Sequence, residues 1–276
     1  MKNVNLLLLV MVAGSNSAWA GDSMPLLPTY FPAAGETYVS MSLSHTDQKS
    51  TTATYGTGIS TGSPNSTART DATSVLMQYG LSESLRIGIA DSYVDATSAP
   101  SGASSGWASP SISIAKDVRS STIEIASVIF SFTPKVGNTP LNGNQSTSIT
   151  GRYSMLLGGA RWGTVAAGYL VRPGNAPDVT SVNFSVAEDF GQYSALLGLG
   201  LSKTADSHLN IQSHTDRNLD YLFNVAISGR VTQAWNWVAQ YTYGTSRSFE
   251  RLDSGAGYLD SSSRSHGIGV SLVAKF

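Results

Sequence analysis

The segment Ser265–Phe276 alternates between two kinds of side chain, and this constrains the fold more than any other feature. Apolar residues occupy every second position from Ile268 to Phe276, and mostly small or polar residues stand between them. A period of two is the signature of a β-strand with one apolar face. Because a solitary strand is not stable in isolation, this one needs partners. The N-terminal strand is the expected partner if the sheet closes on itself.

The same alternation recurs along the chain from Gly35 onward. We count about twelve strands, each with roughly the 9–11 residues that a tilted membrane strand needs. The connections alternate between short turns such as Gly80–Ser84 and long polar loops such as Gln48–Ser66 and Ser246–Ser263. This asymmetry is typical of outer-membrane barrels. Residues 35–276 therefore predict an all-β, antiparallel, up-and-down transmembrane barrel with both termini in the periplasm.

The composition agrees with a membrane barrel better than with a soluble one. Charged residues make up 13% of the chain, against roughly 25% in ordinary soluble domains. A soluble β-sandwich or lipocalin-like barrel needs more lysine and glutamate on its surface, whereas lipid and a mildly polar interior need few charges. The net charge of -1 argues against a nucleic-acid partner. We expect the protein in the outer membrane, with outer-membrane lipid and lipopolysaccharide as surroundings.

Aromatic residues gather at the strand ends, as expected at the two membrane interfaces. The group near the short turns consists of Tyr79, Trp162, Tyr193, Trp235 and Phe276. The group toward the long loops consists of Tyr93, Trp107, Tyr169, Tyr221 and Tyr243. The terminal Phe276 is the expected contact for the barrel-assembly machinery. In the segment Ile123–Phe132 both faces are partly apolar, which predicts a bulge or a register change near Ser127, with Ile125 read among the outward apolar residues.

The N-terminus carries a targeting segment. Met1–Ala20 has a positive Lys2, the apolar run Leu6–Val12 and a small-residue cleavage site at Ala18–Ala20, which is the pattern of a signal peptide. Residues 21–34 follow as a proline-rich periplasmic lead-in. The sequence leaves open whether this lead-in enters the barrel mouth.

The predicted inner face consists mostly of serine, glycine and alanine, so the wall does not fill its own lumen. A twelve-strand barrel lies between sealed and channel-forming sizes. The interior is therefore a narrow pore, a lumen plugged by a loop or by the N-terminal segment, or a sealed barrel. The polar residues expected to line it are Arg86, Glu124, Arg152, Asp220, Asn224 and Gln240.

The inward charges have two interpretations. Buried charges need partners, so arginines and carboxylates can brace the wall, or they can form a selectivity ring for a solute. The interior lacks the ladder of arginine and lysine that an anion-selective pore needs. We therefore expect weak charge selectivity and a preference for small neutral or apolar molecules. No catalytic residue, metal or cofactor is implied.

One hairpin carries a family resemblance. The segment Met77–Ile89, and within it Gln78–Leu85, resembles hairpins of the outer-membrane transporter family associated with the meta-pathway of phenol degradation. That resemblance implies a barrel that takes up aromatic or other hydrophobic compounds. It carries over no site residue.

The sequence thus predicts a passive outer-membrane channel or porin that is not an enzyme. One alternative is a lipase-like barrel hydrolase, in which a histidine activates a serine. His266 is expected near Ser246, Ser248, Ser263 and Ser265, but no histidine has a serine two positions on. The other alternative is a structural or adhesive barrel with serine- and threonine-rich loops.

Overall fold

A computed structural model describes residues 25–56, 60–61, 65–99, 102–136, 145–173, 178–204, 208–210, 213–252 and 257–276. The predicted signal peptide, Met1–Ala20, lies outside these residues. So do the beginning of the lead-in and the middle parts of several long connections.

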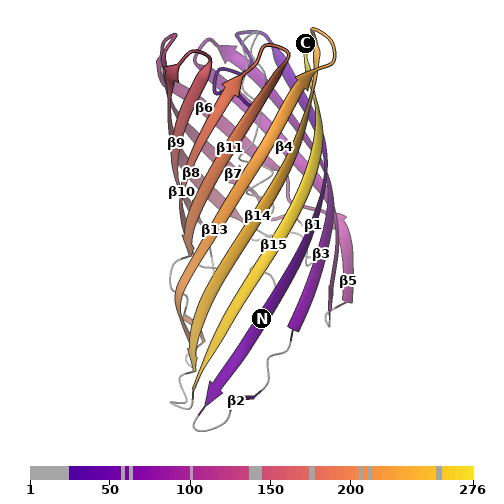
Figure 1. The fold of residues 1–276 in the computed structure, drawn as a ribbon, viewed down its shortest axis with the longest axis vertical. Helices are drawn as coiled ribbons and strands as arrows, with labels where there is room; N and C mark the ends of the chain where they lie inside the picture. The colour runs from indigo at the N-terminus through magenta and orange to yellow at the C-terminus, as the bar shows by residue number, and fades with distance from the viewer. Residues whose placement is uncertain are drawn as a thin grey trace.

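The described strands form one antiparallel sheet that closes into a barrel (Figure 1). Their bounds are β1 Thr37–Gly56, β2 Ser60–Thr61, β3 Asn65–Ser82, β4 Leu85–Ala99, β5 Gly102–Trp107, β6 Ser111–Ser120, β7 Glu124–Thr133, β8 Ser146–Gly158, β9 Arg161–Val171, β10 Val179–Asp189, β11 Tyr193–Thr204, β12 His208–Asn210, β13 Ser213–Arg230, β14 Trp235–Leu252 and β15 Gly257–Lys275. Among the described strands, twelve build the wall, and β2, β5 and β12 are short additions beside it. The predicted twelve-strand antiparallel barrel is confirmed.

The barrel closes where the sequence predicts, between its first and last strands. β1 and β15 pair continuously, with Tyr38 opposite Lys275 at one end and Gly56 opposite Gly257 at the other. At the chain end, Thr37 and Phe276 exchange two backbone hydrogen bonds of 2.9 Å. The alternating carboxy-terminal segment is therefore held on both sides, by β1 and by β14.

The two ends of the barrel differ. The short turns and the C-terminus lie together at the top of Figure 1 (the short-turn end), and the strand ends that border the long connections lie at the bottom (the long-loop end). Several strands run further toward the long-loop end than expected. β1, for example, continues to Gly56 and β14 to Leu252, so much of the predicted loops Gln48–Ser66 and Ser246–Ser263 is strand. These extensions are rich in serine and threonine and are paired in register.

The apolar side chains face outward, as predicted. Met41, Ile268, Val270 and Leu272 are about half exposed, at 56%, 59%, 56% and 48%. Similar side chains continue the band on the other wall strands, among them Ile89, Ile114, Phe184, Leu199 and Phe223. An apolar surface of this extent would be unstable in water and is suited to lipid. Among the described residues, we find no helix with the length and apolar character needed to cross a bilayer.

Two predicted positions on the outer face are wrong. The predicted register change does occur at Ser127, but the extra residue lies in β6, between Asp117 and Arg119 opposite Ser127, and not in β7. β7 therefore keeps its alternation, and Ile125 points inward, where only 2% of it is exposed. Trp162, predicted for the aromatic belt at the short turns, also faces the interior. The other four aromatics of that belt are exposed, from Tyr79 at 38% to Phe276 at 68%.

Candidate functional site: the lumen and its inner segment

Residues 25–36, which we call the inner segment, lie inside the barrel at the short-turn end. Leu27 is buried against Ile125, Trp162 and Ala187, which are inward-facing residues of β7, β9 and β10. Tyr30 is buried on the other side of the lumen, against Tyr38 of β1 and Val273 of β15. The inner segment therefore contacts strands all around the barrel and obstructs the lumen at this level.

Aromatic and polar contacts fix Tyr30 in place. Its ring stacks on Tyr38 with a centroid distance of 5.1 Å. Asn236 of β14 donates a hydrogen bond of 3.0 Å from its amide Nδ2 to the phenolic oxygen of Tyr30. Burial raises the pKa of Tyr30 to about 12, in spite of this hydrogen bond and the charge of Arg230. The phenol is therefore uncharged at neutral pH, as an enclosed position requires.

Three prolines favour the ordered form of the inner segment. Pro25, Pro28 and Pro32 are all buried. Proline fixes one backbone angle, which lowers the entropy that the free chain loses on becoming ordered. Complete burial of a side chain such as Leu27 contributes about 1.5–3 kcal/mol. The proline-rich composition thus favours docking of this segment.

The inner segment leaves the lumen through a close approach to β3. The Gly35 amide donates to the Gly80 carbonyl at 2.8 Å, and the Gly80 amide donates to the Glu36 carbonyl at 3.0 Å. A Cβ atom on Gly80 would lie 2.0 Å from the Ala33 carbonyl oxygen. Gly80 was predicted only as a turn residue. The structure shows that it is also a position at which the backbone of the inner segment leaves no room for a side chain on the wall.

An ionic latch lies at the same exit. Lys275 of β15 pairs with Glu36 at 2.8 Å, and the Ala33 amide donates to the same carboxylate at 2.9 Å. Burial opposes ionisation of Glu36, but these two hydrogen bonds and the charge of Lys275 outweigh it and lower the pKa of Glu36. The latch therefore joins the inner segment to the last strand of the wall.

A buried charge cluster lies under the inner segment. Arg86 of β4 donates from Nη2 to Oδ1 of Asp117 of β6 at 2.5 Å, and both side chains are almost completely buried. The Arg86 guanidinium also lies 4.1 Å from the centroid of the Phe31 ring, a cation–π contact. Arg152 of β8 is buried as well and lies within electrostatic range of Arg86 and Asp117. The wall and the inner segment thus share one cluster.

The other predicted lining residues have separate positions. Asp220 is buried and accepts a long hydrogen bond of 3.4 Å from Ser202. Asn224 is buried on β13, and Gln240 shares the inward face of β14 with Asn236. None of these three contacts the Arg86–Asp117 pair in the described interactions. The predicted lining residues therefore do not form one ring.

Glu124 does not line the lumen, so that prediction is wrong. It pairs in register with Met155, which is on the outer face, and its carboxylate binds Arg119 at 2.7 Å. The cause is the position of the bulge: β7 has no register change, so Glu124 falls on the face opposite Ile125. Arg86 pairs instead with Asp117 of β6, which follows Ser113 and Ala115 on the inward face of that strand and was not among the predicted lining residues.

The remaining inner wall is polar and small, as predicted. Ser154 and Ser194 are fully buried, and Ser194 and Ser228 share a hydrogen bond of 2.6 Å. His266, considered for a hydrolase, lies on the outer face, where its Nδ1 hydrogen-bonds the Tyr241 hydroxyl at 2.8 Å rather than a serine. The nearby pair Ser246 and Ser263 hydrogen-bond each other at 2.7 Å. No described contact activates a serine at His266.

Comparison with known proteins supports the fold. No protein-family model matches the sequence, and no curated protein matches it. Among solved structures, the COG4313 outer membrane channel from Pseudomonas putida F1 is similar, with a TM-score of 0.61 and 14% identity over 89% of this chain and 97% of that one. A deltaS2S3 mutant of the monoaromatic hydrocarbon channel TodX has a TM-score of 0.51 and 12% identity over 95% of this chain and 97% of that one. The chain has the fold of outer-membrane barrel channels.

Proposed function

We propose that this protein is a passive outer-membrane channel for small molecules. The observation that carries the proposal is a closed wall with an apolar outer band and a small, polar inner face. Such a wall separates lipid from a path along the barrel axis. The two similar structures are both called channels in their descriptions. Identity this low shows the fold alone, so the function rests on the geometry.

We propose small neutral or hydrophobic molecules, aromatic ones included, as the solutes. The inward charges Arg86 and Asp117 neutralise each other. The described inner wall therefore has no row of free charges to attract ions. One similar structure is described as a monoaromatic hydrocarbon channel, and the Met77–Ile89 hairpin resembles the transporter family of the meta-pathway of phenol degradation. Both agree with this solute class.

We propose that the short turns and both termini face the periplasm and that the inner segment is a displaceable gate. In this orientation solutes enter at the long-loop end and reach the inner segment last. The contacts of Leu27, Tyr30 and Glu36 hold the closed form. Conduction then requires the inner segment to leave its position, while the strands of the wall keep their arrangement.

Flux through reconstituted protein tests the function. We expect liposomes that contain the protein to take up small uncharged aromatic molecules faster than empty liposomes, with little difference between cations and anions in planar-bilayer conductance. Lipid hydrolysis without flux would favour the hydrolase. A structural or adhesive barrel would be favoured if neither flux nor hydrolysis is seen, both in the intact protein and in a variant without the inner segment.

Substitution of Gly80 is expected to weaken the closed form. A methyl group at Gly80 meets the Ala33 carbonyl, and overpacking of this kind typically costs about 1–3 kcal/mol. Gly80→Ala should therefore raise the open fraction at least several-fold in single-channel recordings. The matched control is Gly151→Ala, because a Cβ at Gly151 meets nothing within 4 Å. Equal behaviour of the two variants would remove Gly80 from the gate.

Acid is expected to release the Glu36 latch. The pKa of Glu36 is lowered from its ordinary value of 4.5 in the latched form, so its contribution to the closed form is present above that value. It is lost as the pH falls below 4.5 and through the pKa of the latched form. We expect constant gating from neutral pH to about 5 and more frequent opening below about 4. In Glu36→Gln this acid-dependent step should disappear, and its persistence would assign it to another group.

A further inference from the structure

The outer face of the barrel changes abruptly from apolar to charged on β14, β15, β1 and β3. The last large aliphatic residues toward the long-loop end are Leu43 on β1 and Ile268 on β15, both well exposed. Beyond them, Lys49 and Arg264 are exposed on the same face. At about 3.3 Å per residue and a strand tilt near 40°, the two cations lie about 10–15 Å beyond the apolar edge. They thus lie beyond the lipid tails.

Lys49 and Arg264 face each other directly. They are partners in the β1–β15 register, and the next residues in the same row are Thr67 on β3 and Thr245 on β14. Like charges in directly opposed positions destabilise a sheet. An anion between them would convert this repulsion into two charge-assisted hydrogen bonds. The row therefore offers two cations flanked by two hydroxyl groups.

The neighbouring carboxylates are already paired. His45 bonds Asp71 at 2.6 Å and Asp47 at 3.1 Å, and Arg69 lies 3.3 Å from Asp71. In the described part of the chain, no ion pair joins a carboxylate to either Lys49 or Arg264. Within this part of the structure, these two charges are therefore available to an external anion.

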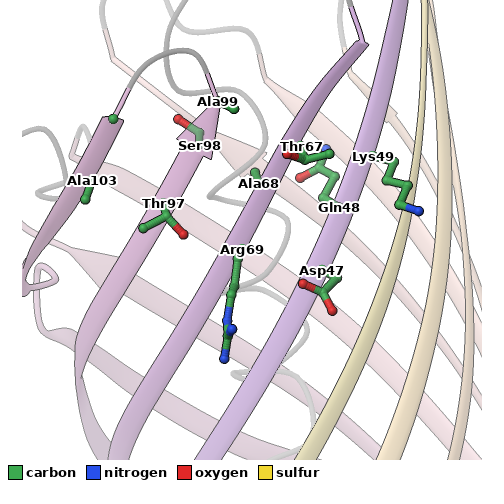
Figure 2. Close-up of a pocket in the computed structure, with 11 residues that line it drawn as sticks. Asp47, Gln48, Lys49, Thr67, Ala68, Arg69, Thr97, Ser98, Ala99 and Ala103 are labelled. Atoms are coloured by element: carbon green, nitrogen blue, oxygen red, sulfur yellow. The ribbon is translucent and has the colours of Figure 1, made fainter.

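A hollow adjoins the row. Its volume is about 780 Å³, and it extends from β1 across β3 to β4 and β5. Figure 2 shows Lys49, Asp47, Thr67 and Arg69 at this hollow, with the Lys49 side chain directed away from Arg69. On the other side, toward the apolar edge, the Tyr243 ring contacts the His266 ring in a tilted arrangement, with a centroid distance of 5.0 Å. The cations are thus bordered by space for a bulky polar group and by aromatic rings.

We propose that Lys49 and Arg264, with Thr67 and Thr245, bind a phosphate group on the sugar headgroup of an outer-leaflet glycolipid. An ordinary phospholipid headgroup layer is only about 5–7 Å thick on each side, which is less than the distance of this row from the apolar edge. A phosphorylated sugar headgroup extends further from the tails and brings hydroxyl groups for the hollow. The proposal rests on the membrane location proposed above but not on conduction.

Binding of purified lipopolysaccharide to the detergent-solubilised protein tests this site. The probe is a rough lipopolysaccharide that retains its lipid A phosphates, and the comparison probe is the same material after enzymatic dephosphorylation. We expect Lys49→Gln/Arg264→Gln to bind the phosphorylated probe about tenfold or more weakly, because two hydrogen bonds between charged groups are lost. The matched control is Lys135→Gln/Lys203→Gln, which removes two exposed lysines from the same end of the barrel. Unchanged binding by this control supports the site.

Four results would overturn the proposal. In the first, wild type and Lys49→Gln/Arg264→Gln bind the phosphorylated probe with equal affinity. In the second, Lys49→Gln/Arg264→Gln and the control Lys135→Gln/Lys203→Gln lose the same affinity, which indicates general attraction between charges. The dephosphorylated probe binds wild type as well as the phosphorylated one does. Inorganic phosphate displaces the glycolipid at a concentration comparable to that of the glycolipid itself, which indicates a site for free phosphate. Flux measured on the same preparations separates failure of this site from failure of the channel function.

Discussion

Deletion of residues 25–34 is expected to convert a mostly closed barrel into a conducting one. The deletion removes Leu27, Tyr30 and Phe31 from the lumen but keeps Glu36 and the whole of β1. Each 1.4 kcal/mol lost from the closed form changes the ratio of open to closed states about tenfold. We expect a rise of well over tenfold in open probability, measured by single-channel recording in planar bilayers.

A single substitution should show the same effect more selectively. Leu27→Ala removes a buried side chain from the cluster with Ile125 and Trp162, and such truncations typically cost about 2–5 kcal/mol. The matched control is Leu43→Ala, because Leu43 lies on the outer face of β1 and does not touch the inner segment. Leu27→Ala should open the channel and Leu43→Ala should not. If both leave it closed, something other than this cluster holds the gate.

Cross-linking separates displacement of the inner segment from loosening of the wall. The chain has no cysteine, so thiols introduced at Leu27 and Ala187, two members of one buried cluster, are the only reactive ones. We expect a short thiol-reactive cross-linker with a cleavable disulfide to lock the channel in its closed form. Reduction of the cross-link should restore opening of the channel. Equal conductance before and after cross-linking would show that solutes pass without movement of the inner segment.

The wall was predictable from the sequence because the pattern that specifies it is local. Alternation at positions such as Ile268, Val270 and Leu272 depends only on one strand facing lipid on one side. The closure of β1 on β15 follows from the same alternation, together with an even number of strands. Strand number and the outward direction of the apolar face therefore required no knowledge of long-range contacts.

The interior was less predictable because a second layer covers part of it. Ile125 and Trp162 read as outward residues, since an apolar side chain is expected to face lipid. They face inward because Leu27 covers them, and that contact joins residues far apart in the sequence. A local signal was present: Leu156–Leu157 and Leu196–Leu197 are apolar on both faces close to short turns. Such pairs indicate apolar contacts inside the barrel as well as outside it.

Neutralisation of Asp117 is expected to be the most destabilising single change in the wall. Its carboxylate is bound by Arg86 and attracts Arg152, while the two arginines repel each other. Asp117→Asn therefore leaves two buried positive charges in mutual repulsion, whereas Arg86→Met leaves one positive and one negative charge within range. Breaking a buried pair typically costs about 3–5 kcal/mol. We expect Asp117→Asn to lie at the upper end of this range, with Arg86→Met less destabilised.

The double variant and a matched carboxylate complete the test, with urea unfolding in lipid vesicles as the measurement. Asp117→Asn/Arg86→Met should be more stable than Asp117→Asn, because the second change removes one of the two repelling charges. Asp220→Asn should cost little, since the described interactions of this buried carboxylate include a hydroxyl but no cation. The same variants distinguish bracing from solute selection. A large loss of stability with unchanged ion selectivity identifies the cluster as a brace, whereas unchanged stability with altered selectivity would place these charges on the solute path.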